Sequence, residues 1–342
     1  MQSRRFSVNN PRWTVEADAG TRAAAEAAAE QLAAIDPVDD TESFVTAAQL
    51  QAAQLPEPFR RELQRFRRFG NELGGLLVKG LPVGAVPPTP TSADDAMGIK
   101  LPAARTMSVV VALLGDQYGF KPELGGKVVQ DVLPVAGFEY TQQSISSEKP
   151  LFDHTEMAFT EHRADYVGLF CIRQDHDRVA GTTLSSVDRM LPLLDPATIA
   201  TLREKRFKTT VDGSFLRGFG RREPIWIGPI RVLEGPLDRP RLRADFAETR
   251  GTDAVAQAAL DQLREAGKEC ATELRLAAGD LLIVDNHRAF HGRTRFTPRW
   301  DGRDRWLLRT FVSRDLSRSV AVRPGDGRIV DTDYSTGPDV LG

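Results

Sequence analysis

Six short runs of β-branched and aromatic residues follow one another from Lys127 onward, and they restrict the fold more than any other pattern in the chain. Gly, Pro and Asp separate these runs, as expected for an antiparallel β-sandwich or barrel. The expected strands are Val128 to Val132, Asp165 to Ile172, Phe207 to Val211, Ile225 to Val232, Leu281 to Val284 and Trp306 to Val312. The core is therefore predicted to be mainly β.

One helix is expected to interrupt this β-rich part. Thr252 to Gly267 carries Ala and Leu at helical spacing, with charged residues on the opposite face. A helix with a single apolar face packs across a sheet and does not join it. We therefore expect a helical insertion near residues 252–267, lying on a β core that spans residues 126–320.

Residues 1–125 have a mainly helical pattern. Residues 21–35 are rich in Ala, and Pro37 marks where that helix has ended. Apolar residues recur at intervals of three and four from Ala47 to about Phe69, which predicts an amphipathic helix, and residues 103–119 also have a helical pattern. These helices are expected to form a layer over the β core.

Two shorter segments lie between these helices. Gly74 to Gly80 is apolar and bounded by glycine, which predicts a buried strand, and Pro82 to Ser92 carries four prolines, which predict an irregular connector. With a C-terminal tail at residues 321–342, the chain is most simply interpreted as one domain over residues 1–342.

The overall composition favours a globular protein that binds a small molecule. The chain has 342 residues, of which 41% are hydrophobic, with a formal charge of −2 and a pI near 6.3. No excess of positive charge favours nucleic acid or an anionic membrane as partner. Only Cys171 and Cys270 are present, and the N-terminus is polar without an apolar signal segment. These features predict a cytoplasmic protein, and they do not specify its oligomeric state.

Three residues suggest a metal centre. His154 and Glu156 are two apart, so on a strand both side chains would leave from the same face. His291 follows the apolar run Leu281 to Val284, which can present a third ligand. Two imidazoles and one carboxylate can occupy one face of an octahedral Fe(II) and leave positions open for a cosubstrate and dioxygen. No His-Glu-x-x-His sequence of zinc proteases is present.

Each of these candidate site residues also has an interpretation that involves no metal or ligand. A single His-x-Glu pair can be a surface strand pair, and His162, His176 and His287 are expected to be surface or supporting residues. Arg305, fourteen residues after His291, is the feature that favours a functional site. Its planar guanidinium could return to the pocket and bind a dicarboxylate. The ordinary interpretation of Arg305 is an arginine at the end of a strand.

Several longer motifs together resemble the clavaminate synthase-like family of Fe(II)/2-oxoglutarate oxygenases, especially the branch that hydroxylates free amino acids such as arginine, asparagine and lysine. The similarity runs across most of the chain. The motifs are His154-Thr155-Glu156-Met157-Ala158-Phe159, Gly279 to Asn286 leading to His291-Gly292-Arg293, Pro298 to Gly302 leading to Asp304-Arg305-Trp306, and Leu76 to Pro82.

The resemblance implies a fold and a set of cofactors. The fold is a double-stranded β-helix, the cupin-like jelly roll, covered by N-terminal and inserted helices. Fe(II) is held by His154, Glu156 and His291, with 2-oxoglutarate and O₂ as cosubstrates. Arg305 and Thr182 match the residues that bind the distal carboxylate of 2-oxoglutarate. Related halogenases replace the carboxylate ligand by a small residue, so Glu156 argues against halogenation.

The resemblance also implies a substrate site. Arg309 matches the arginine that holds the α-carboxylate of the amino acid, and Ser144 matches a substrate-contacting position. Asp212 and Asp245 match acids that neutralise a cationic side chain, but Ala247 stands where a second carboxylate is common. That difference favours a neutral polar side chain, although lysine stays open. The ordinary interpretation of Asp212 is a turn residue ahead of glycine.

Two further features of the substrate site are expected on weaker grounds. Glu123 or Gln130 could receive the α-ammonium of the substrate, because both lie in the stretch leading to the first strand of the β core. Gly218-Phe219-Gly220 lies in a stretch rich in glycine and arginine that is either a lid over the substrate or a plain surface loop.

The expected activity is hydroxylation of an unactivated carbon, C3 or C4, of a free L-amino acid with a polar or basic side chain, of the lysine, arginine, citrulline, asparagine or glutamine type. The setting would be the biosynthesis of a natural product such as an antibiotic. One alternative keeps the same oxidant and ends in desaturation or ring closure. Another is a non-catalytic jelly roll that binds a metal or a small ligand.

Overall fold

A mixed β-sheet forms the centre of the computed structural model, which describes residues 13–92, 96–334, 336 and 339–341. The polar N-terminus expected to lack a signal segment lies outside the described residues. Within them the sheet has eight strands. In spatial order these are β1 (Thr14–Glu16), β2 (Gly75–Lys79), β14 (Leu281–Asp285), β6 (Tyr166–Arg173), β16 (Trp306–Ser313), β3 (Asp116–Phe120) and β17 (Ile329–Val330), and β4 (Gln130–Val132) also pairs with β16. The β1–β2 and β3–β17 pairs are parallel, and the others are antiparallel.

A second, four-stranded sheet faces the first across an apolar core. Its antiparallel strands, in order, are β13 (Thr272–Leu274), β7 (Thr182–Ser186), β15 (Ala289–Arg293) and β5 (Leu151–His154). Leu282 and Val284 of β14 pack in one buried cluster with Leu184 of β7 and Ala289 of β15. Two smaller sheets lie beside these: β12 (Arg250–Gly251), β8 (Phe207–Thr210), β9 (Trp226–Ile230) and β18 (Val340–Leu341); and β10 (Leu233–Glu234) with β11 (Arg241–Leu242).

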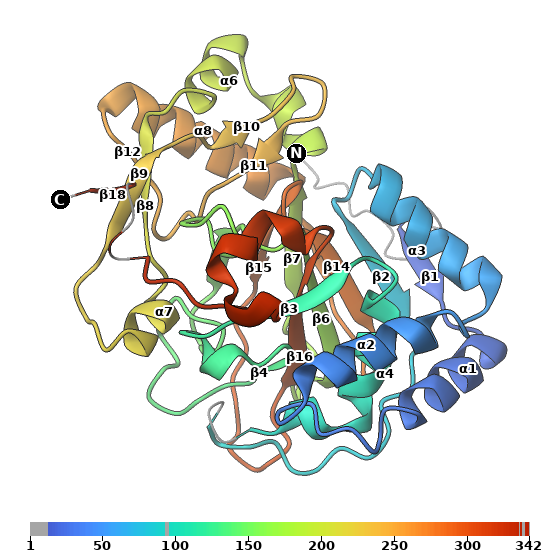
Figure 1. Cartoon of the computed structure of the whole chain (residues 1–342). Helices are drawn as coiled ribbons and strands as arrows, with labels where there is room; N and C mark the ends of the chain where they lie inside the picture. Colours follow the sequence, from blue (N-terminus) through green and yellow to red (C-terminus); the bar gives the residue numbers. More distant parts are fainter. Residues whose placement is uncertain (1–12, 93–95, 335, 337–338, 342) are drawn as a thin grey trace.

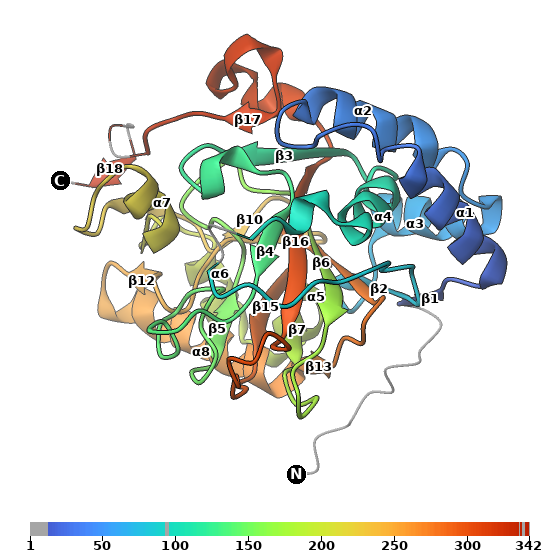
Figure 2. The same cartoon turned by 90° about the horizontal axis from the view of Figure 1, so that it is seen from below.

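Helices cover the outer faces of both sheets, as Figures 1 and 2 show. Phe44, Leu63 and Met107 from the N-terminal helices pack with Leu76 and Val78 of β2. On the other side, α8 packs through its apolar stripe against the four-stranded sheet. The α-helices are α1 (Ala19–Glu30), α2 (Thr41–Ala52), α3 (Glu57–Phe69), α4 (Pro102–Val111), α5 (Val187–Met190), α6 (Pro196–Leu202), α7 (Gly213–Gly218) and α8 (Ala254–Cys270). Short 3₁₀ turns are η1 (Gly98–Lys100), η2 (Leu124–Gly126), η3 (Leu191–Leu193), η4 (Leu316–Val322) and η5 (Pro324–Asp326).

The six expected strands are all present, as β4, β6, β8, β9, β14 and β16, each within a few residues of its predicted ends. The strand at Gly74 to Gly80 is β2, and the insertion near residues 252–267 is α8. The N-cap residue of α8, Asp253, accepts hydrogen bonds from two backbone amides of the first turn, and these bonds fix where α8 starts. The proline-rich connector has no regular structure over residues 82–90.

Two helix predictions are wrong in detail. The single helix expected from Ala47 to Phe69 is divided into α2 and α3, because Pro56 has no amide hydrogen to donate and disfavours helical backbone at Leu55. The helix expected over residues 103–119 ends at Val111, and Asp116–Phe120 is instead β3, paired with β16. Gly115 permits this pairing, because a Cβ there would lie 2.1 Å from the Ser313 carbonyl oxygen. The first 125 residues thus also supply β1, β2 and β3 to the main sheet.

The described part of the chain carries no sign of a membrane span or of a disulfide bond. None of the helices found there combines the length and the apolar character needed to cross a membrane. Cys171 and Cys270 are both buried and unpaired, and burial is the main cause that raises the pKa of each thiol, to about 12 and about 11 respectively. Both thiols are therefore protonated and behave as small apolar side chains.

Candidate active site

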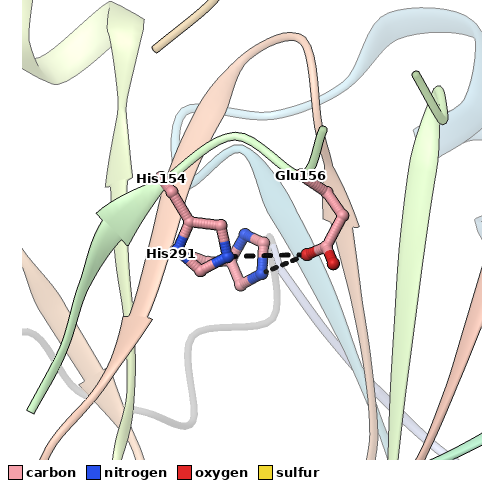
Figure 3. A group of neighbouring side chains, drawn as sticks. All are labelled: His154, Glu156 and His291. Carbon is pink, nitrogen blue, oxygen red and sulfur yellow. Dashed lines mark ion pairs between the residues drawn. The ribbon is translucent and has the colours of Figure 1, made fainter. Parts of the chain in front are cut away.

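His154 and His291 lie directly opposite each other on neighbouring antiparallel strands, β5 and β15. Their rings are 4.3 Å apart between centroids, and both point to the space between the two sheets (Figure 3). The Nδ1 of His154 lies 2.8 Å from the carbonyl oxygen of Phe152, which turns Nε2 toward the site. Strand pairing therefore brings together two imidazoles that are 137 positions apart in the sequence.

Glu156 reaches the same point from outside the strand. The expectation that His154 and Glu156 share one strand face is wrong, because β5 ends at His154 and Glu156 lies in the turn that follows. Its Oε2 is 3.5 Å from Nε2 of His154 and 3.3 Å from Nε2 of His291. Asn286 holds this turn: its Oδ1 accepts a hydrogen bond from the Glu156 amide at 2.7 Å, and its Nδ2 donates to the Glu156 carbonyl at 3.1 Å.

Arg309 of β16 is the principal counter-charge at the site. Its guanidinium donates to Oε1 of Glu156, to Oε1 of Glu123 at 2.7 Å, and to Oε1 of Gln130 at 2.6 Å. Burial alone would raise the pKa of Glu156, but Arg309 and the two imidazoles outweigh it and hold that pKa well below its usual value. Glu156 is thus a buried carboxylate that stays ionised.

These three side chains form a donor set that fits a divalent transition metal. The ligand atoms of His154, Glu156 and His291 all lie within 4.8 Å of one another. Burial and the neighbouring His154 lower the pKa of His291, which favours the neutral imidazole that a metal requires. Burial alone would also lower the pKa of His154, but Glu156 outweighs it and raises that pKa to about 9, so a metal would displace a proton from this ring. Two imidazoles with one carboxylate are the set expected for a non-haem iron centre with open positions.

A second group, His176 with Asp301 and Asp304, has a different character. Asp304 is already occupied by the backbone amides of Arg299 and Trp300, at 2.7 and 2.8 Å. The two ring nitrogens of His176 face different carboxylates: Nε2 lies 3.0 Å from Asp301, and Nδ1 lies 3.6 Å from Asp304. The ligand atoms of this group also lie within 4.8 Å of one another, but Asp304 is already engaged by backbone amides, and His176 therefore braces the loop that leads to β16.

The metal-binding group opens into a cavity of about 570 Å³. Arg305 and Arg309 both line it, together with Leu307, because alternate residues leading into and along β16 face the same side. Most of the other residues predicted for the site also line this cavity, namely Glu123, Ser144, Thr182, Asp212 and Asp245. Gln130 differs: it is buried behind Arg309, and its carbonyl orients that guanidinium.

Three acids that line the cavity have a raised pKa. Burial raises the pKa of Asp212 well above its usual value, and Asp245, Glu156 and Glu123 raise it further. Burial likewise raises the pKa of Asp245, whose backbone bridges His154. Burial also raises the pKa of Glu123 against the opposing effect of Arg309. A cation in this part of the cavity would lower the electrostatic cost of these groups.

Arg305 is a buried cation without an acid partner, because no carboxylate among the described residues forms an ion pair with it. It lies over the Phe296 ring at 5.7 Å, and Arg293 lies over the same ring at 5.1 Å. Burial, followed by repulsion from Arg305, lowers the pKa of Arg293 to about 9. Two buried guanidinium groups without an acid favour an anionic ligand at this end of the cavity.

The family of the chain follows from a match over residues 40–311 to the model described as "Taurine catabolism dioxygenase TauD, TfdA family". The chain belongs to the TauD/TfdA family. Curated members of similar sequence include an L-asparagine oxygenase of Streptomyces coelicolor, 41% identical over 85% of this chain and 86% of that protein. Others are an L-lysine 3-hydroxylase of Catenulispora acidiphila, 38% identical over 85% and 82%, and clavaminate synthase 2 of Streptomyces clavuligerus, 37% identical over 85% and 90%. The expected resemblance to clavaminate synthase-like oxygenases is confirmed.

The TauD/TfdA assignment also agrees with solved structures. An asparagine oxygenase in complex with Fe(II), 2S,3S-3-hydroxyasparagine and succinate superposes with a TM-score of 0.88 and 38% identity. The match covers 94% of this chain and 100% of that one. The main sheet, the facing sheet and the helices over them are therefore arranged as in an oxygenase that acts on a free amino acid.

Three residues at this TauD/TfdA site were not singled out from the sequence. Asn286 lies in a recognised motif, yet its bond to the Glu156 backbone joins residues 130 positions apart. Arg293, two residues after His291 on β15, lines the cavity, and the alternation of side chains along a strand predicts that it shares the face of His291. Glu248 lies in a turn, with no periodic pattern to indicate that it lines the cavity.

Proposed function

We propose that this TauD/TfdA protein is an Fe(II)- and 2-oxoglutarate-dependent dioxygenase that hydroxylates C3 or C4 of a free L-amino acid with a polar or basic side chain. The observation that carries the proposal is that His154, Glu156 and His291 line one cavity together with two arginines. The two arginines differ in their acid partners. Within the part of the chain that the structure describes, Arg305 has no acid partner, whereas Arg309 is paired with Glu156 and Glu123. The relatives named for asparagine and lysine support the same substrate class.

The cosubstrate end of the cavity has the following roles in this proposal. His154, Glu156 and His291 hold Fe(II), which together with 2-oxoglutarate and O₂ supplies the oxidant for an unactivated C–H bond. Arg305 binds the distal carboxylate of 2-oxoglutarate, and Thr182 of β7 assists it. The unpaired, buried guanidinium of Arg305 supports this role, because a carboxylate would relieve its desolvation.

The substrate end has a complementary set of roles. Arg309 holds the α-carboxylate, and Glu123, 2.7 Å from Arg309, receives the α-ammonium. Ser144, Asp212 and Asp245 contact the rest of the substrate, while Gln130 orients Arg309. Because Arg309 is anchored beside Glu156, the substrate carbon nearest the metal is decided by the distance from its own carboxylate.

We further propose that the two facing sheets form a double-stranded β-helix and that residues 1–342 are a single oxygenase domain. The facing antiparallel sheets with one shared core support the first proposal. The contribution of β1, β2 and β3 to the main sheet supports the second, because the N-terminal helices are then joined to the core by strand pairing.

Anaerobic titration with Fe(II) and 2-oxoglutarate tests the metal site. We expect a weak visible charge-transfer band in the wild type and its loss in His154→Ala. His176→Ala is the matched control, because that histidine also lies beside two carboxylates but outside the cavity, and it should keep the band. Absence of the band from the wild type would overturn the oxygenase proposal in favour of a non-catalytic ligand-binding protein.

A panel of L-amino acids, scored for substrate-dependent succinate, tests the activity. Product mass separates hydroxylation, a gain of one oxygen, from desaturation, a loss of two hydrogens. Arg309→Ala should reduce coupled turnover at least about 30-fold for every amino acid, because it removes one partner of a buried, hydrogen-bonded charge pair. Coupled turnover that survives in Arg309→Ala would contradict the α-carboxylate role.

A further inference from the structure

The substrate end of the cavity contains more acid than the chain itself neutralises. Among the described residues that line the whole cavity, six carry carboxylates and four are arginines. Asp131 is satisfied by the Trp306 indole at 2.7 Å and the Gly98 amide at 3.2 Å. Glu123 and Glu156 are paired with Arg309. Asp212, Asp245 and Glu248 are the remaining acids, and no lysine or arginine of the described chain forms an ion pair with any of them.

These three acids come from two segments of the chain. Asp212 follows β8 at the start of α7, while Asp245 and Glu248 belong to one turn in which the Glu248 amide donates to the Asp245 carbonyl at 3.0 Å. Asp245 lies beside His154, with which it forms an isolated bridge. The Glu248 side chain instead points toward β8, where its carboxylate accepts a hydrogen bond from the Thr210 hydroxyl. The acids therefore extend from the metal-binding group to a second position farther along the wall.

Glu248 also borders a second cavity of about 380 Å³. The two cavities share four lining residues, which are Gln142, Phe152, Ala247 and Glu248. Ala247 has the smallest side chain of the four, and it stands where the resemblance leads us to expect a second carboxylate. A carboxylate is nevertheless present one residue later, and the Thr210 hydroxyl fixes its direction.

We propose that Glu248 replaces the carboxylate missing at residue 247 and, together with Asp212, receives the cationic end of an extended substrate side chain, an amine or a guanidine. This inference rests on the proposed function. It reverses the preference for a neutral side chain that Ala247 alone suggested. A neutral group of the same shape would leave two half-buried carboxylates without a positive partner, so the cavity discriminates by charge.

Arginine and citrulline are a suitable test pair, because their side chains are similar in length and shape and differ in charge. The experiment measures kcat/KM for each from hydroxylated product and succinate. We expect the wild type to prefer arginine. In Glu248→Gln the arginine-to-citrulline ratio should fall at least about tenfold, because a charge-assisted hydrogen bond is lost. Lysine against glutamine is a second pair with a different cation.

Two controls separate specificity from folding. Asp261→Asn removes an acid that lines only the second cavity, where it accepts a hydrogen bond from Gln257 at 3.0 Å, and it should leave the ratio unchanged. The charge-transfer band with Fe(II) and 2-oxoglutarate should be the same in Glu248→Gln as in the wild type. A band that persists while the ratio collapses assigns the effect to substrate recognition.

The possible outcomes distinguish the two proposals. A wild type that hydroxylates citrulline, glutamine or asparagine better than the cationic amino acids would overturn the inference and leave the proposed function intact. A preference for cations that is unchanged in Glu248→Gln would also overturn it, because another group would then hold the cation. Loss of the band and of all turnover in the wild type would instead reject the proposed function.

Discussion

At the scale of single residues, the position of the Glu156 carboxylate depends on a side-chain amide. Glu156 follows the end of β5 and is not fixed by strand pairing. Asn286 binds both its backbone amide and its carbonyl, and also donates to the Ala164 carbonyl at 3.0 Å. The loss of a group that orients a metal ligand in this way typically lowers metal affinity about 10- to 100-fold.

Asn286→Ala should therefore weaken Fe(II) binding about 10- to 100-fold. Anaerobic titration, followed by the charge-transfer band, measures the change. Asn71→Ala is a matched control, because the Asn71 amide likewise binds backbone groups of Leu73 and Gly75 but lies away from the cavity. That variant should lose stability and keep its iron affinity. Equal iron affinity in Asn286→Ala and wild type would contradict the positioning role.

At the scale of elements, the pairing of β5 with β15 sets the distance between the two histidines. Gly292 lies between His291 and Arg293 on β15, where the pairing with β5 shifts register. A Cβ at this glycine would lie 2.4 Å from Oδ1 of Asp153 and 2.7 Å from the Leu151 carbonyl oxygen. Since the second of these atoms is backbone, only movement of a strand could accommodate it.

Gly292→Ala should move β5 away from β15 and weaken Fe(II) binding, with a loss of about 1–3 kcal/mol in the free energy of unfolding. Metal titration and denaturant unfolding measure the two effects. Gly20→Ala in α1 is the control, because its added methyl group would meet its nearest neighbour at an ordinary 3.6 Å. If Gly292→Ala bound Fe(II) like the wild type, the strand pairing would not be what fixes the site.

A second element-scale link connects β15 to the irregular segment at residues 134–150. Arg293 donates to the Ser146 hydroxyl and to the Lys149 carbonyl, both at 2.9 Å, and to the Ser146 carbonyl. The same segment supplies Ser144 to the cavity wall. The proposed cosubstrate end and the proposed substrate end of the site are therefore joined through the Arg293 guanidinium.

Arg293→Met should release this segment, because it removes charge-assisted hydrogen bonds of about 1.5–3 kcal/mol each. We expect faster hydrogen exchange over residues 138–149 and a KM for the amino acid raised about tenfold or more. Arg288→Met removes another arginine, next to the start of β15, that bonds Asp188 and the Pro240 carbonyl, and it should leave both quantities near wild type. Unchanged exchange in Arg293→Met would contradict the link.

At the scale of the whole molecule, Asp165 joins segments that are far apart in the sequence. It precedes β6 and accepts hydrogen bonds from His287 at 3.1 Å, from the Arg314 amide at 2.7 Å and from Arg318. Burial alone would raise the pKa of Asp165, but these partners outweigh it and lower the pKa to about 2. The ionised carboxylate is thus favoured by the folded state.

The stability that Asp165 contributes should depend on pH with a definite sign. Its pKa is lower when folded, about 2, than the ordinary value of 3.8, so the contribution is complete above about pH 5 and is lost as the pH falls toward 2. Asp165→Asn should cost about 2 kcal/mol near neutral pH, and the difference from wild type should shrink between pH 5 and pH 3. Urea unfolding across this range measures it, and a difference independent of pH would contradict the assignment.

Much of the fold is predictable from local sequence because periodicity reports which face of an element is buried. The six strand predictions and α8 are of this kind. The break at Pro56 was also visible in the sequence, since proline removes a donor, but the apolar spacing on both sides concealed it. Asp116–Phe120 is different: its strand conformation depends on pairing with β16, almost 200 residues later, which no local pattern encodes.

The sequence by itself determined which chemical groups are available: two histidines and a glutamate in a family motif, two arginines at alternating positions, and an alanine where an acid is common. The tertiary structure decided which of them meet. It placed Glu156 by a turn and Asn286, and it brought Ala247 and Glu248 to the wall of the cavity. It also paired Arg309 with two acids, while among the described residues no acid pairs with Arg305. The physical reason is that donor types are local properties of a chain, whereas burial, charge balance and distance depend on contacts between segments that only folding brings together.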